Sequence, residues 1–477
     1  MYIKRIGYTA LHVALEVKMS EVAALVLAAG KGTRMKSELV KVLHEAGGVP
    51  LIDWPVMAAK GAGAGRVVLV AGHQAERVKD HFRDDSSVSF AIQEEQLGTG
   101  HAVACASAAL AGFNGTVLIL CGDVPLIRPE TLKGLLEYHR DRKAALTVMT
   151  THLENPFGYG RVVKREAGQI VRIVEQKDAS RAELEIKEIN SGIYCVEAKF
   201  LFEAVARLSN DNAQKEYYLT DIVKQAAANN LLCLAFSVDD PDEVMGVNDR
   251  VQLAAAGAVL RRRINESFML SGVTVVDPAS AYLDFTVKIG TDTIIHPNVH
   301  ISGDTVIGKG CVIEPSAVIR NCIIADRVTI KAGSVMSDSA IGEGAAIGPM
   351  AHLRPGSQLG AHVKIGNFVE TKKIVMGEGS KASHLTYLGD ASIGRDVNIG
   401  CGTITCNYDG VSKHRTVIGD GVFVGSDVQF VAPITVGANA LIAAGTTVTQ
   451  DIPPDSLALA RVPQVNKVDW VKKKRSS

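Results

Sequence analysis

The amino-acid sequence predicts an α/β chain in two parts, a Rossmann-like domain with a mixed, mainly parallel sheet and then a parallel β-helix. Three observations predict it. Short apolar runs alternate with amphipathic stretches up to about residue 247, a proline-free run of helix formers follows at 249–270, and beyond it aliphatic residues recur at every sixth position. The length of 477 residues also exceeds what one hydrophobic core normally supports.

Composition excludes several classes of protein. Lys plus Arg and Asp plus Glu number 51 each, so no net charge favours nucleic acid or an anionic membrane surface. The eight cysteines include no CxxC pair and are too sparse for a disulfide framework. No apolar run approaches the roughly 20 residues of an integral membrane segment. We therefore expect a cytoplasmic protein.

The first domain is expected at 19–247, after an N-terminal extension, residues 1–18, to which we assign no function. Strands are expected at 22–30, 66–72 and 116–123, and ligands of such sheets gather at the carboxyl ends of the strands. The first strand runs into LAAGKGTRM at 27–35, where Gly30 and Gly32 permit close approach of the backbone to a ligand. Arg34 and Lys41 offer countercharge for phosphates. By itself this turn fits neither the P-loop nor the GxGxxG spacing, and a glycine-rich turn needs no ligand.

Further motifs follow in a fixed order: QLGTGHA at 96–102, LCGDVPLI at 120–127, GYGR at 158–161, VEQKDA at 174–179, EINSGIY at 188–194 and GVNDR at 246–250. Together with Lys41 they resemble the nucleotide-sugar pyrophosphorylase family across the whole first domain. The resemblance implies that the uridine nucleotide is held by Leu27, Ala28, Ala29, Gly30, Gln93, Gly98, Thr99, Cys121, Gly122 and Asp123, and the sugar by Gly160, Glu175 and Asn190.

The same resemblance implies Mg²⁺ at Asp123 and Asn248, whose hard oxygens suit an ion shared with substrate phosphates. The implied reaction is in-line attack of a sugar 1-phosphate on the α-phosphorus of UTP, with Arg34 and Lys41 stabilising the developing charge as pyrophosphate leaves. Asp123 alone is equally explained as the cap of a turn at a strand end. Two residues depart from the family pattern, Val40 in place of a proline and Cys121 in place of a tyrosine or other polar residue.

A helical linker is expected at 248–270, and the six-residue repeat fills the second domain at 271–477. One register holds Ile289, Ile295, Ile301, Ile307, Ile313 and Ile319; a second holds Val335, Ile341, Ile347, Leu353, Leu359 and Ile365; a third holds Ile418, Val424, Phe430, Val436, Ile442 and Val448. Each aliphatic side chain should point into a continuous interior, and the glycines that often follow should help the backbone turn its corners. A left-handed coil is implied by the resemblance to hexapeptide proteins and does not follow from the period.

Two charged segments interrupt the repeat, at about 366–392 and at 405–415. These segments resemble the acetyltransferase half of the bifunctional UDP-N-acetylglucosamine pyrophosphorylase/glucosamine-1-phosphate N-acetyltransferase family, and the match runs from about residue 20 to 470. The resemblance implies that His384 is the general base for the sugar 2-amine, a role that suits an imidazole, with Glu370 orienting it. It implies glucosamine 1-phosphate binding by Arg354, Lys372, Tyr387 and Asn398. A solvated outer face is the alternative for the cations, and we prefer it for Lys373 and Lys381.

The resemblance also implies six coenzyme positions that are spread over the coils, and this spread favours assembly between neighbouring subunits: Cys401, Asn407, Tyr408, Ser426, Ala444 and Arg461. That the assembly is a homotrimer is implied by the resemblance and not by the spacing. Cys401 stands where many relatives have alanine. No cation beside it would activate a thiolate, so a covalent cysteine mechanism is disfavoured. The terminal KKKR is expected to be a solvated tail.

The sequence thus predicts synthesis of UDP-N-acetylglucosamine, a precursor of the cell envelope. Acetyl-CoA acetylates glucosamine 1-phosphate, and UTP then uridylates N-acetylglucosamine 1-phosphate. One alternative is a uridylyltransferase whose β-helix serves only as a trimerisation or regulatory scaffold, but His384 and the charged interruptions disfavour it. The other is a binding protein with degenerate sites, which the joint presence of Arg34, Lys41, Asp123, Asn248 and His384 disfavours.

Overall fold

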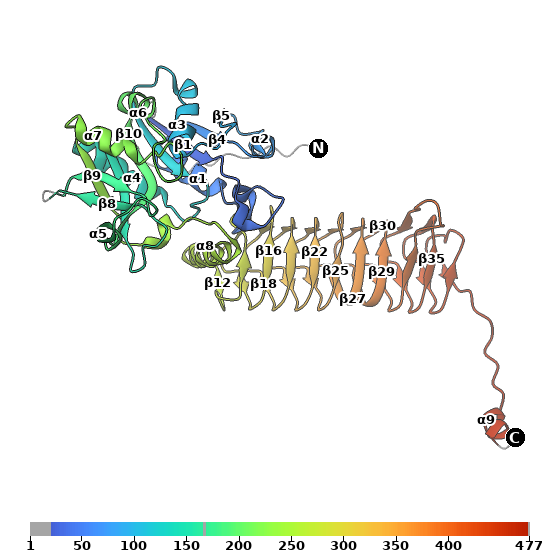
Figure 1. Cartoon of the computed structure of the whole chain (residues 1–477). Coiled ribbons are helices and arrows are strands. Elements are labelled where there is room, and N and C mark those ends of the chain that lie inside the picture. The colour runs from blue at the N-terminus through green and yellow to red at the C-terminus, as the bar shows by residue number, and fades with distance from the viewer. Residues whose placement is uncertain (1–20, 166–167, 476–477) are drawn as a thin grey trace. The chain divides into compact units, whose positions relative to one another are not determined.

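The structure is a computed structural model that describes residues 21–165 and 168–475 (Figure 1). The N-terminal extension expected at 1–18 lies outside the described residues. The chain divides into two compact units between Leu260 and Arg261. Each unit has its own strands and its own interior, and each is described by itself below.

The first unit is built on a nine-stranded sheet in which seven strands follow the order β11-β7-β10-β6-β1-β4-β5. Strands β5, β4, β1 and β6 run parallel, β11 runs parallel to β7, and β10 lies antiparallel between β6 and β7. The mixed sheet is therefore confirmed. The strands are β1 (Val22–Ala28), β4 (Arg66–Ala71), β5 (Val88–Ile92), β6 (Thr116–Cys121), β7 (Leu146–His152), β8 (Arg161–Lys164), β9 (Ile170–Val174), β10 (Glu188–Glu197) and β11 (Cys233–Ser237), with a separate hairpin of β2 (Glu45–Ala46) and β3 (Val49–Pro50).

Helices cover both faces of this sheet. Alternate residues of β1 enter opposite cores, Ala24 and Val26 with α1 and α4, and Ala23 and Leu25 with α3, α6 and α7. Burial on both faces explains why the strand is apolar throughout. The helices are α1 (Asp53–Gly61), α2 (Ala75–His81), α3 (Thr99–Cys105), α4 (Pro129–Asp141), α5 (Arg181–Leu184), α6 (Ala198–Val205) and α7 (Asp221–Ala228), with 3-10 turns η1 (Thr33–Met35), η2 (Lys41–Leu43), η3 (Ala108–Leu110) and η4 (Pro241–Val244).

The segment of helix formers that was predicted at 249–270 is one helix, α8 (Arg250–Leu270). Its Ala256 and Leu260 join a small core with Leu51, Leu126 and Val247 of the first unit. Within the described residues, no helix combines the length and the apolar character that a membrane span requires.

The second unit is a parallel β-helix. Each coil contributes three short strands, and equivalent strands of successive coils pair to form three stacks. One stack is β12 (Thr274–Val275), β15 (Ile294–Ile295), β18 (Val312–Ile313), β21 (Thr329–Ile330), β24 (Ala346–Ile347), β31 (Asn398–Ile399), β34 (Phe423–Val424), β37 (Leu441–Ile442) and β39 (Leu457–Ala458). The second is β13 (Tyr282–Leu283), β16 (His300–Ser302), β19 (Val318–Arg320), β22 (Val335–Ser337), β25 (His352–Leu353), β32 (Ile404–Cys406), β35 (Gln429–Val431) and β38 (Thr447–Val448). The third is β14 (Lys288–Ile289), β17 (Val306–Ile307), β20 (Ile323–Ile324), β23 (Ala340–Ile341), β26 (Gln358–Leu359), β28 (Val375–Met376), β30 (Ala391–Ile393), β33 (Thr416–Ile418) and β36 (Ile434–Val436).

Two nine-residue strands, β27 (Lys364–Lys372) and β29 (Lys381–Gly389), belong to the first and second stacks at once because they pair along both. They occupy the first charged interruption of the repeat. The β-helix therefore continues through this segment with longer strands. A short helix, α9 (Trp470–Arg475), ends the described chain.

The interior register agrees with the six-residue period except at one predicted position. Ile295, Ile301 and Ile313 are fully buried, whereas Val335 is 42% exposed and Met336 takes its place inside. The coil that begins at Met336 has 17 residues, since Met336 is in register with Leu353, and its step from Met336 to Ile341 is five residues and not six. The assignment of Val335 to the interior was wrong for this reason.

The glycines that follow the aliphatic residues of the repeat are needed because neighbouring coils approach closely there, and not because they adopt unusual backbone dihedrals. A Cβ on Gly342 would lie 2.4 Å from the carbonyl carbon of Gly360 on the next coil, and one on Gly308 would lie 2.7 Å from that of Ala325. Neither glycine has a positive φ. The left-handed conformation at corners is adopted by other glycines, such as Gly310 and Gly344, and by polar residues such as Asn298 and Asn321, which tolerate it better than most side chains.

Candidate active sites

A glycine-rich turn follows β1 and brings Lys41 to the end of the sheet. Gly32 has a φ of 61°, and a Cβ there would lie 2.5 Å from the Cβ of Lys41. Only glycine therefore lets the segment that holds Lys41 pack against this turn. A Cβ on Gly30 would meet nothing within 4 Å, so the turn is open on the other side.

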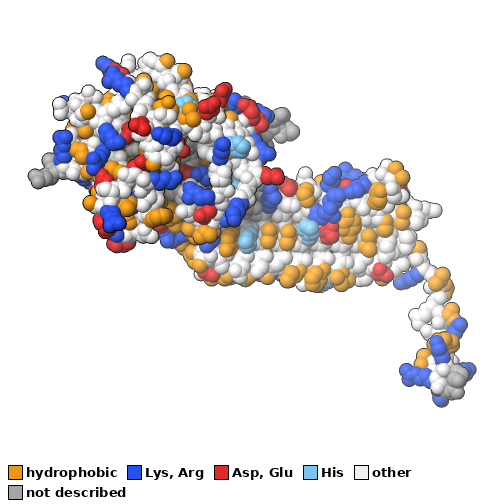
Figure 2. Space-filling view, in the orientation of Figure 1, with side chains coloured by type: hydrophobic (Ala, Val, Ile, Leu, Met, Phe, Trp, Pro, Cys, Tyr) orange, Lys and Arg blue, Asp and Glu red, His pale blue; other side chains and the backbone are white. Residues whose placement is uncertain are grey.

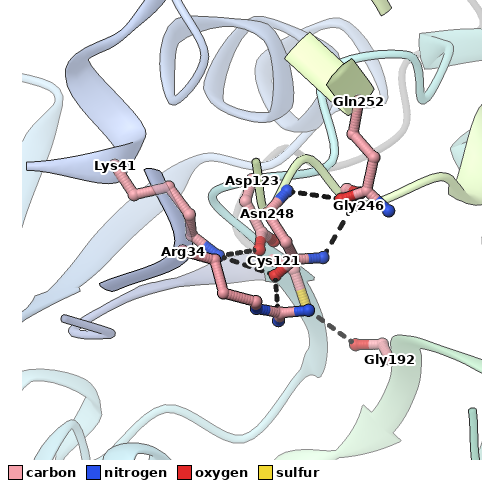
Figure 3. A network of polar contacts seen from close by, with 8 residues as sticks. All are labelled: Arg34, Lys41, Cys121, Asp123, Gly192, Gly246, Asn248 and Gln252. Atoms are coloured by element: carbon pink, nitrogen blue, oxygen red, sulfur yellow. Dashed lines mark hydrogen bonds and ion pairs between the residues drawn. The ribbon is translucent and has the colours of Figure 1, made fainter. Parts of the chain in front are cut away.

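Lys41 and Arg34 converge on the oxygens of Asp123 and Asn248 (Figure 3). The Lys41 ammonium forms an ion pair with the Asp123 carboxylate and donates to Asn248 Oδ1 at 3.3 Å. Arg34 Nη2 donates to the same oxygen at 2.9 Å. The strand β6 carries Asp123 just past its end, and the Val247 amide donates to the Asp123 carbonyl at 2.8 Å. All four predicted residues thus meet at one point, although Asn248 lies 214 positions after Arg34 and 207 after Lys41 in the sequence.

The orientation of Asn248 is fixed by neighbours that the sequence did not reveal. Its amide nitrogen donates to Gly246 O at 3.4 Å, and its backbone N–H donates to Gln252 Oε1 at 2.8 Å. Gln252 lies in the first turn of α8, one helical turn after Asn248. The spacing of four residues is the only sequence signal that indicates this contact.

A cavity of about 280 Å³ opens beside this network. Ten of the predicted nucleotide residues line it: Leu27, Ala28, Ala29, Gly30, Lys41, Gln93, Gly98, Thr99, Cys121 and Asp123. The sequence missed four lining residues: Val42, Gln96, Ala102 and Glu216. Predicted Gly122 does not line the cavity, and its N–H donates to Leu27 O at 2.9 Å. The side-chain amide of Gln93 stabilises this part of the cavity wall by donating to Gly98 O at 3.0 Å.

The three residues expected at the sugar lie together but do not line this cavity. Asn190 N donates to Gly160 O at 2.9 Å, and a Cβ on Gly160 would lie 3.5 Å from both carboxylate oxygens of Glu175. Thr220 Oγ1 donates to Glu175 Oε1 at 3.2 Å. Burial raises the pKa of Glu175, which favours its protonated form and its use as a hydrogen-bond donor or acceptor.

The two departures from the family pattern change little in the geometry. Val40 has a φ of −57°, close to the value that a proline ring imposes. The Cys121 thiol lies 3.6 Å from Gly192 O, and burial followed by the charge of Asp123 raises its pKa to about 12. The thiol is therefore protonated and is not a nucleophile.

The residues present fit a magnesium ion. Asp123 Oδ2 and Asn248 Oδ1 already contact one cation, the Lys41 ammonium, so both oxygens reach a common point. Among the described residues no group of three or more His, Cys, Asp or Glu side chains could enclose a metal. Magnesium commonly takes one or two protein oxygens and completes its shell with phosphate and water.

In the second unit, cations gather where β25, β27 and β29 lie side by side, and Figure 2 shows Lys and Arg side chains grouped on the β-helix. Arg354 Nη1 donates to Glu370 Oε1 at 2.8 Å, and Glu370 is in register with Tyr387. The neighbouring Lys413 lowers the pKa of Lys372, and the charge of Arg354 adds to this effect. An anion bound beside these side chains would offset their mutual repulsion.

His384 lies on β29 in register with Asn367 and is exposed. In the described part of the chain no hydrogen bond joins it to Glu370, which holds Arg354 instead. Asn398 is in register with Lys381 and Phe423 in the first stack, whereas Tyr387 is in register with Ile404 in the second. Within one chain, therefore, Asn398 and Tyr387 lie on different faces.

Four of the predicted coenzyme residues form a column along one corner of successive coils. Cys401 O accepts from Asp427 N at 2.7 Å, Ser426 O accepts from Gly445 N at 2.9 Å, and Arg461 Nη1 donates to Ala444 O at 3.2 Å. The backbone thus links Cys401, Ser426 and Ala444 from coil to coil, and Arg461 joins them through its guanidinium.

The other two, Asn407 and Tyr408, begin the second interruption, which is a loop between β32 and β33 as predicted. Asn407 is buried and its amide donates to Asp390, whereas Tyr408 is 60% exposed and pairs with Lys413 across the loop. Asp409 closes the loop by accepting from Ser412 N at 2.7 Å and by pairing with His414, and these contacts hold the pKa of its carboxyl far below the usual range. The loop also brings Lys413 to Lys372, a contact that sequence reasoning did not use.

Comparisons with known proteins cover both units. Residues 23–241 match the Nucleotidyl transferase family, 266–371 match the EIF2B subunit epsilon LbH domain, and 415–450 match Bacterial transferase hexapeptide (six repeats). The hexapeptide match and the parallel stacks confirm the predicted left-handed β-helix.

Full-length relatives are similar along nearly the whole chain. The protein named Bifunctional protein GlmU of Geotalea uraniireducens is 68% identical over 96% of this chain and 100% of its own length. Proteins of the same name are 66% identical in Pelobacter propionicus, over 95% of this chain and 98% of theirs, and 49% identical in Listeria monocytogenes, over 95% and 99%.

Proposed function

Since the chain belongs to the GlmU family of bifunctional enzymes and carries both uridylyl and acetyl transfer, we propose how its residues divide the two reactions. Residues 19–247 carry out uridylyl transfer, 248–270 are the linker, and 271–477 carry out acetyl transfer. The observation that carries the first assignment is the convergence of Lys41, Arg34, Asp123 and Asn248 beside a cavity of nucleotide size.

In the uridylyl site the backbone from Leu27 to Gly30, with Gln93, Gly98 and Thr99, holds the uridine side of UTP. Gly160, Glu175 and Asn190 hold the sugar of N-acetylglucosamine 1-phosphate, which attacks the α-phosphorus as pyrophosphate leaves. Asp123 and Asn248 hold Mg²⁺, which neutralises phosphate charge when it is bound. Lys41 and Arg34 stabilise charge on the oxygens around the α-phosphorus. The protonated Cys121 thiol supports direct transfer without a covalent enzyme intermediate.

In the acetyl site Arg354, Lys372, Tyr387 and Asn398 bind glucosamine 1-phosphate. The charge repulsion around Lys372 supports this, because a phosphate would relieve it. His384 takes a proton from the sugar 2-amine as the amine attacks the thioester carbonyl of acetyl-CoA, and the thiolate of CoA leaves. The coenzyme lies along the column of Cys401, Ser426, Ala444 and Arg461 and against Asn407 and Tyr408.

We further propose a homotrimer in the cytoplasm. Asn398 and Tyr387 lie on different faces of one chain, so a site that uses both needs a neighbouring chain. Outward-facing apolar side chains along the stacks would be covered in such an assembly, among them Ile323, Val375 and Phe423. All eight cysteines are free, as a reducing compartment requires. Light scattering of the purified protein tests the trimer, and a monomer at assay concentration would contradict it.

The assignment is tested with purified protein, glucosamine 1-phosphate, acetyl-CoA, UTP and magnesium, with release of CoA and of pyrophosphate followed separately. Asp123→Ala should abolish pyrophosphate release and leave CoA release unchanged. His384→Ala should lower CoA release by a factor of about 100 to 10,000, the usual contribution of a general base, and leave uridylation of N-acetylglucosamine 1-phosphate unchanged. Either variant that keeps its assigned activity near that of the unsubstituted protein shows that its site assignment is wrong.

A further inference from the structure

Arg161 is a buried arginine without an acidic partner. It is 2% exposed, and no ion pair between described residues includes it. Its Nε is buried and has no hydrogen-bond partner, and burial lowers its pKa. Because a buried charge is costly unless it is paired, the presence of arginine here needs a specific reason.

The two ends of the guanidinium hold two different chain segments. Nη1 donates to the carbonyl of Tyr159, and Nη2 donates to Gln176 Oε1 at 2.9 Å. The same Gln176 oxygen accepts from Gly158 N at 3.1 Å. Arg161 and Gln176 therefore tie the turn at 158–160 to the segment that follows β9. The planar fork of arginine spans two acceptors in a fixed geometry, which lysine cannot do.

These segments carry the groups that we assign to the sugar. Gly160 lies between Tyr159 and Arg161, and its carbonyl accepts from Asn190 N. Glu175 directly precedes Gln176, and its carboxylate lies against the Cα position of Gly160. Backbone pairing of Arg161 with Val174 and with Ile189 aligns the strands, and the Arg161 side chain adds the bridge that holds the turn carrying Gly160 against the segment after β9.

We propose that Arg161 is a positioning residue for the sugar half of the uridylyl site, acting through Tyr159 O and Gln176. It contacts no substrate itself. It holds Gly160 between Asn190 and Glu175 before the sugar arrives, so that binding costs little reorganisation. The inference rests on the proposed assignment of Gly160, Glu175 and Asn190 to the sugar.

The proposal predicts a selective effect on one substrate. In Arg161→Met the KM for N-acetylglucosamine 1-phosphate should rise about 10- to 100-fold, as expected when a charged hydrogen-bond donor to two partners is lost. The KM for UTP should change less than about twofold, because the uridine wall around Gln93 and Gly98 does not use Arg161. Arg161→Lys should resemble Arg161→Met, since it keeps the charge but cannot bridge both acceptors.

Two further variants complete the test. Gln176→Ala removes one acceptor with a side chain that is only half buried, and it should raise the KM for the same substrate. The double variant should be no worse than Arg161→Met alone, because both substitutions break one connection. Lys164→Met is the matched control: it removes another cation of β8, which pairs with Glu188 at 2.6 Å, and it should leave both KM values unchanged.

An equal rise in both KM values, additive effects in the double variant, or normal kinetics in Arg161→Lys would each overturn the proposal. If Arg161→Met does not fold, as judged by loss of UTP binding in calorimetry, Gln176→Ala decides the matter alone. Asn190→Ala separates this inference from the site assignment. If it leaves the sugar KM unchanged the assignment fails, whereas a normal Arg161→Met beside an impaired Asn190→Ala overturns only the role of Arg161.

Discussion

Gly32→Ala should disable uridylyl transfer through a contact that can be measured in the structure. The glycine has a φ of 61°, and an alanine there would cost about 1–2 kcal/mol of backbone strain. The added Cβ would also lie 2.5 Å from Lys41 Cβ and 3.5 Å from Lys41 Cα. Because the closest approach involves the root of the side chain, rotation of Lys41 cannot relieve it. The segment of Lys41 must move, and its ammonium must leave Asp123.

Displacement of a catalytic group by about 1 Å costs about 100-fold in rate, and we expect a fall of that size in kcat for pyrophosphate release. Gly112→Ala is the matched control. Gly112 has a φ of 77°, but a Cβ there would meet nothing within 4 Å. The Gly112→Ala variant should therefore lose a similar amount of free energy of unfolding, and its kcat for pyrophosphate release should not change.

The assay is pyrophosphate release at saturating substrates, with thermal unfolding measured on both variants and CoA release as an internal control for the second unit. Gly32→Ala with a kcat within about twofold of the unsubstituted protein would refute the reasoning, because the contact with Lys41 would then be relieved at no cost. Equal loss of activity in Gly112→Ala would refute it as well, by showing that backbone strain alone is responsible.

Three other substitutions test charge and packing. Lys413→Met should bring the pKa of Lys372 back up toward its ordinary value and raise the KM for glucosamine 1-phosphate about tenfold, measured by CoA release; an unchanged KM would contradict a phosphate site here. The hydrogen bond that protonated His81 donates to the Asp53 carboxylate raises the pKa of His81, so the stabilisation from this pair is complete below the ordinary histidine pKa and is lost as pH rises through the raised value. His81→Gln should accordingly lower the urea midpoint at about pH 5.5 and have little effect at about pH 9, and the reverse order would refute the assignment. Gly342→Ala should destabilise the β-helix and abolish CoA release while pyrophosphate release continues, because its Cβ would lie 2.4 Å from Gly360 C; normal CoA release would show that the coils can separate.

The features that the sequence predicted correctly are those with a local periodic cause. Strand β1 is apolar at every position because both of its faces are buried, and the expected run at 22–30 contains it. Helix α8 begins within one residue of the expected start. The hexapeptide period indicates the β-helix because one side chain per strand must enter the interior, and it fails at Val335, because the step from Met336 to Ile341 is one residue short. The change of register between Ile319 and Val335 shows in the sequence that the period is interrupted, but only the pairing of the strands shows that Met336 takes the inner position.

The features that could not be predicted depend on contacts between distant segments. Lys413 meets Lys372 only because a loop returns across the coil, and Glu216 reaches the nucleotide cavity from a segment that carries none of the motifs. The bridge from Arg161 to Gln176 needs the antiparallel pairing of β8 with β9. No period or motif in the sequence encodes these approaches, so only the folded chain reveals them.

Lys41 and Lys372 are held in opposite ways before substrate arrives. Lys41 is paired with Asp123 in a partly buried position, so its charge is already compensated. The phosphates of a nucleotide must replace this ion pair when they bind Lys41. Lys372 is instead next to Lys413, and binding of a phosphate removes a repulsion. The first arrangement favours discrimination, because an anion gains little unless it replaces the lost pair with equal geometry. The second favours capture of any small phosphate, so selection of the sugar must depend on the groups that contact its ring and amine.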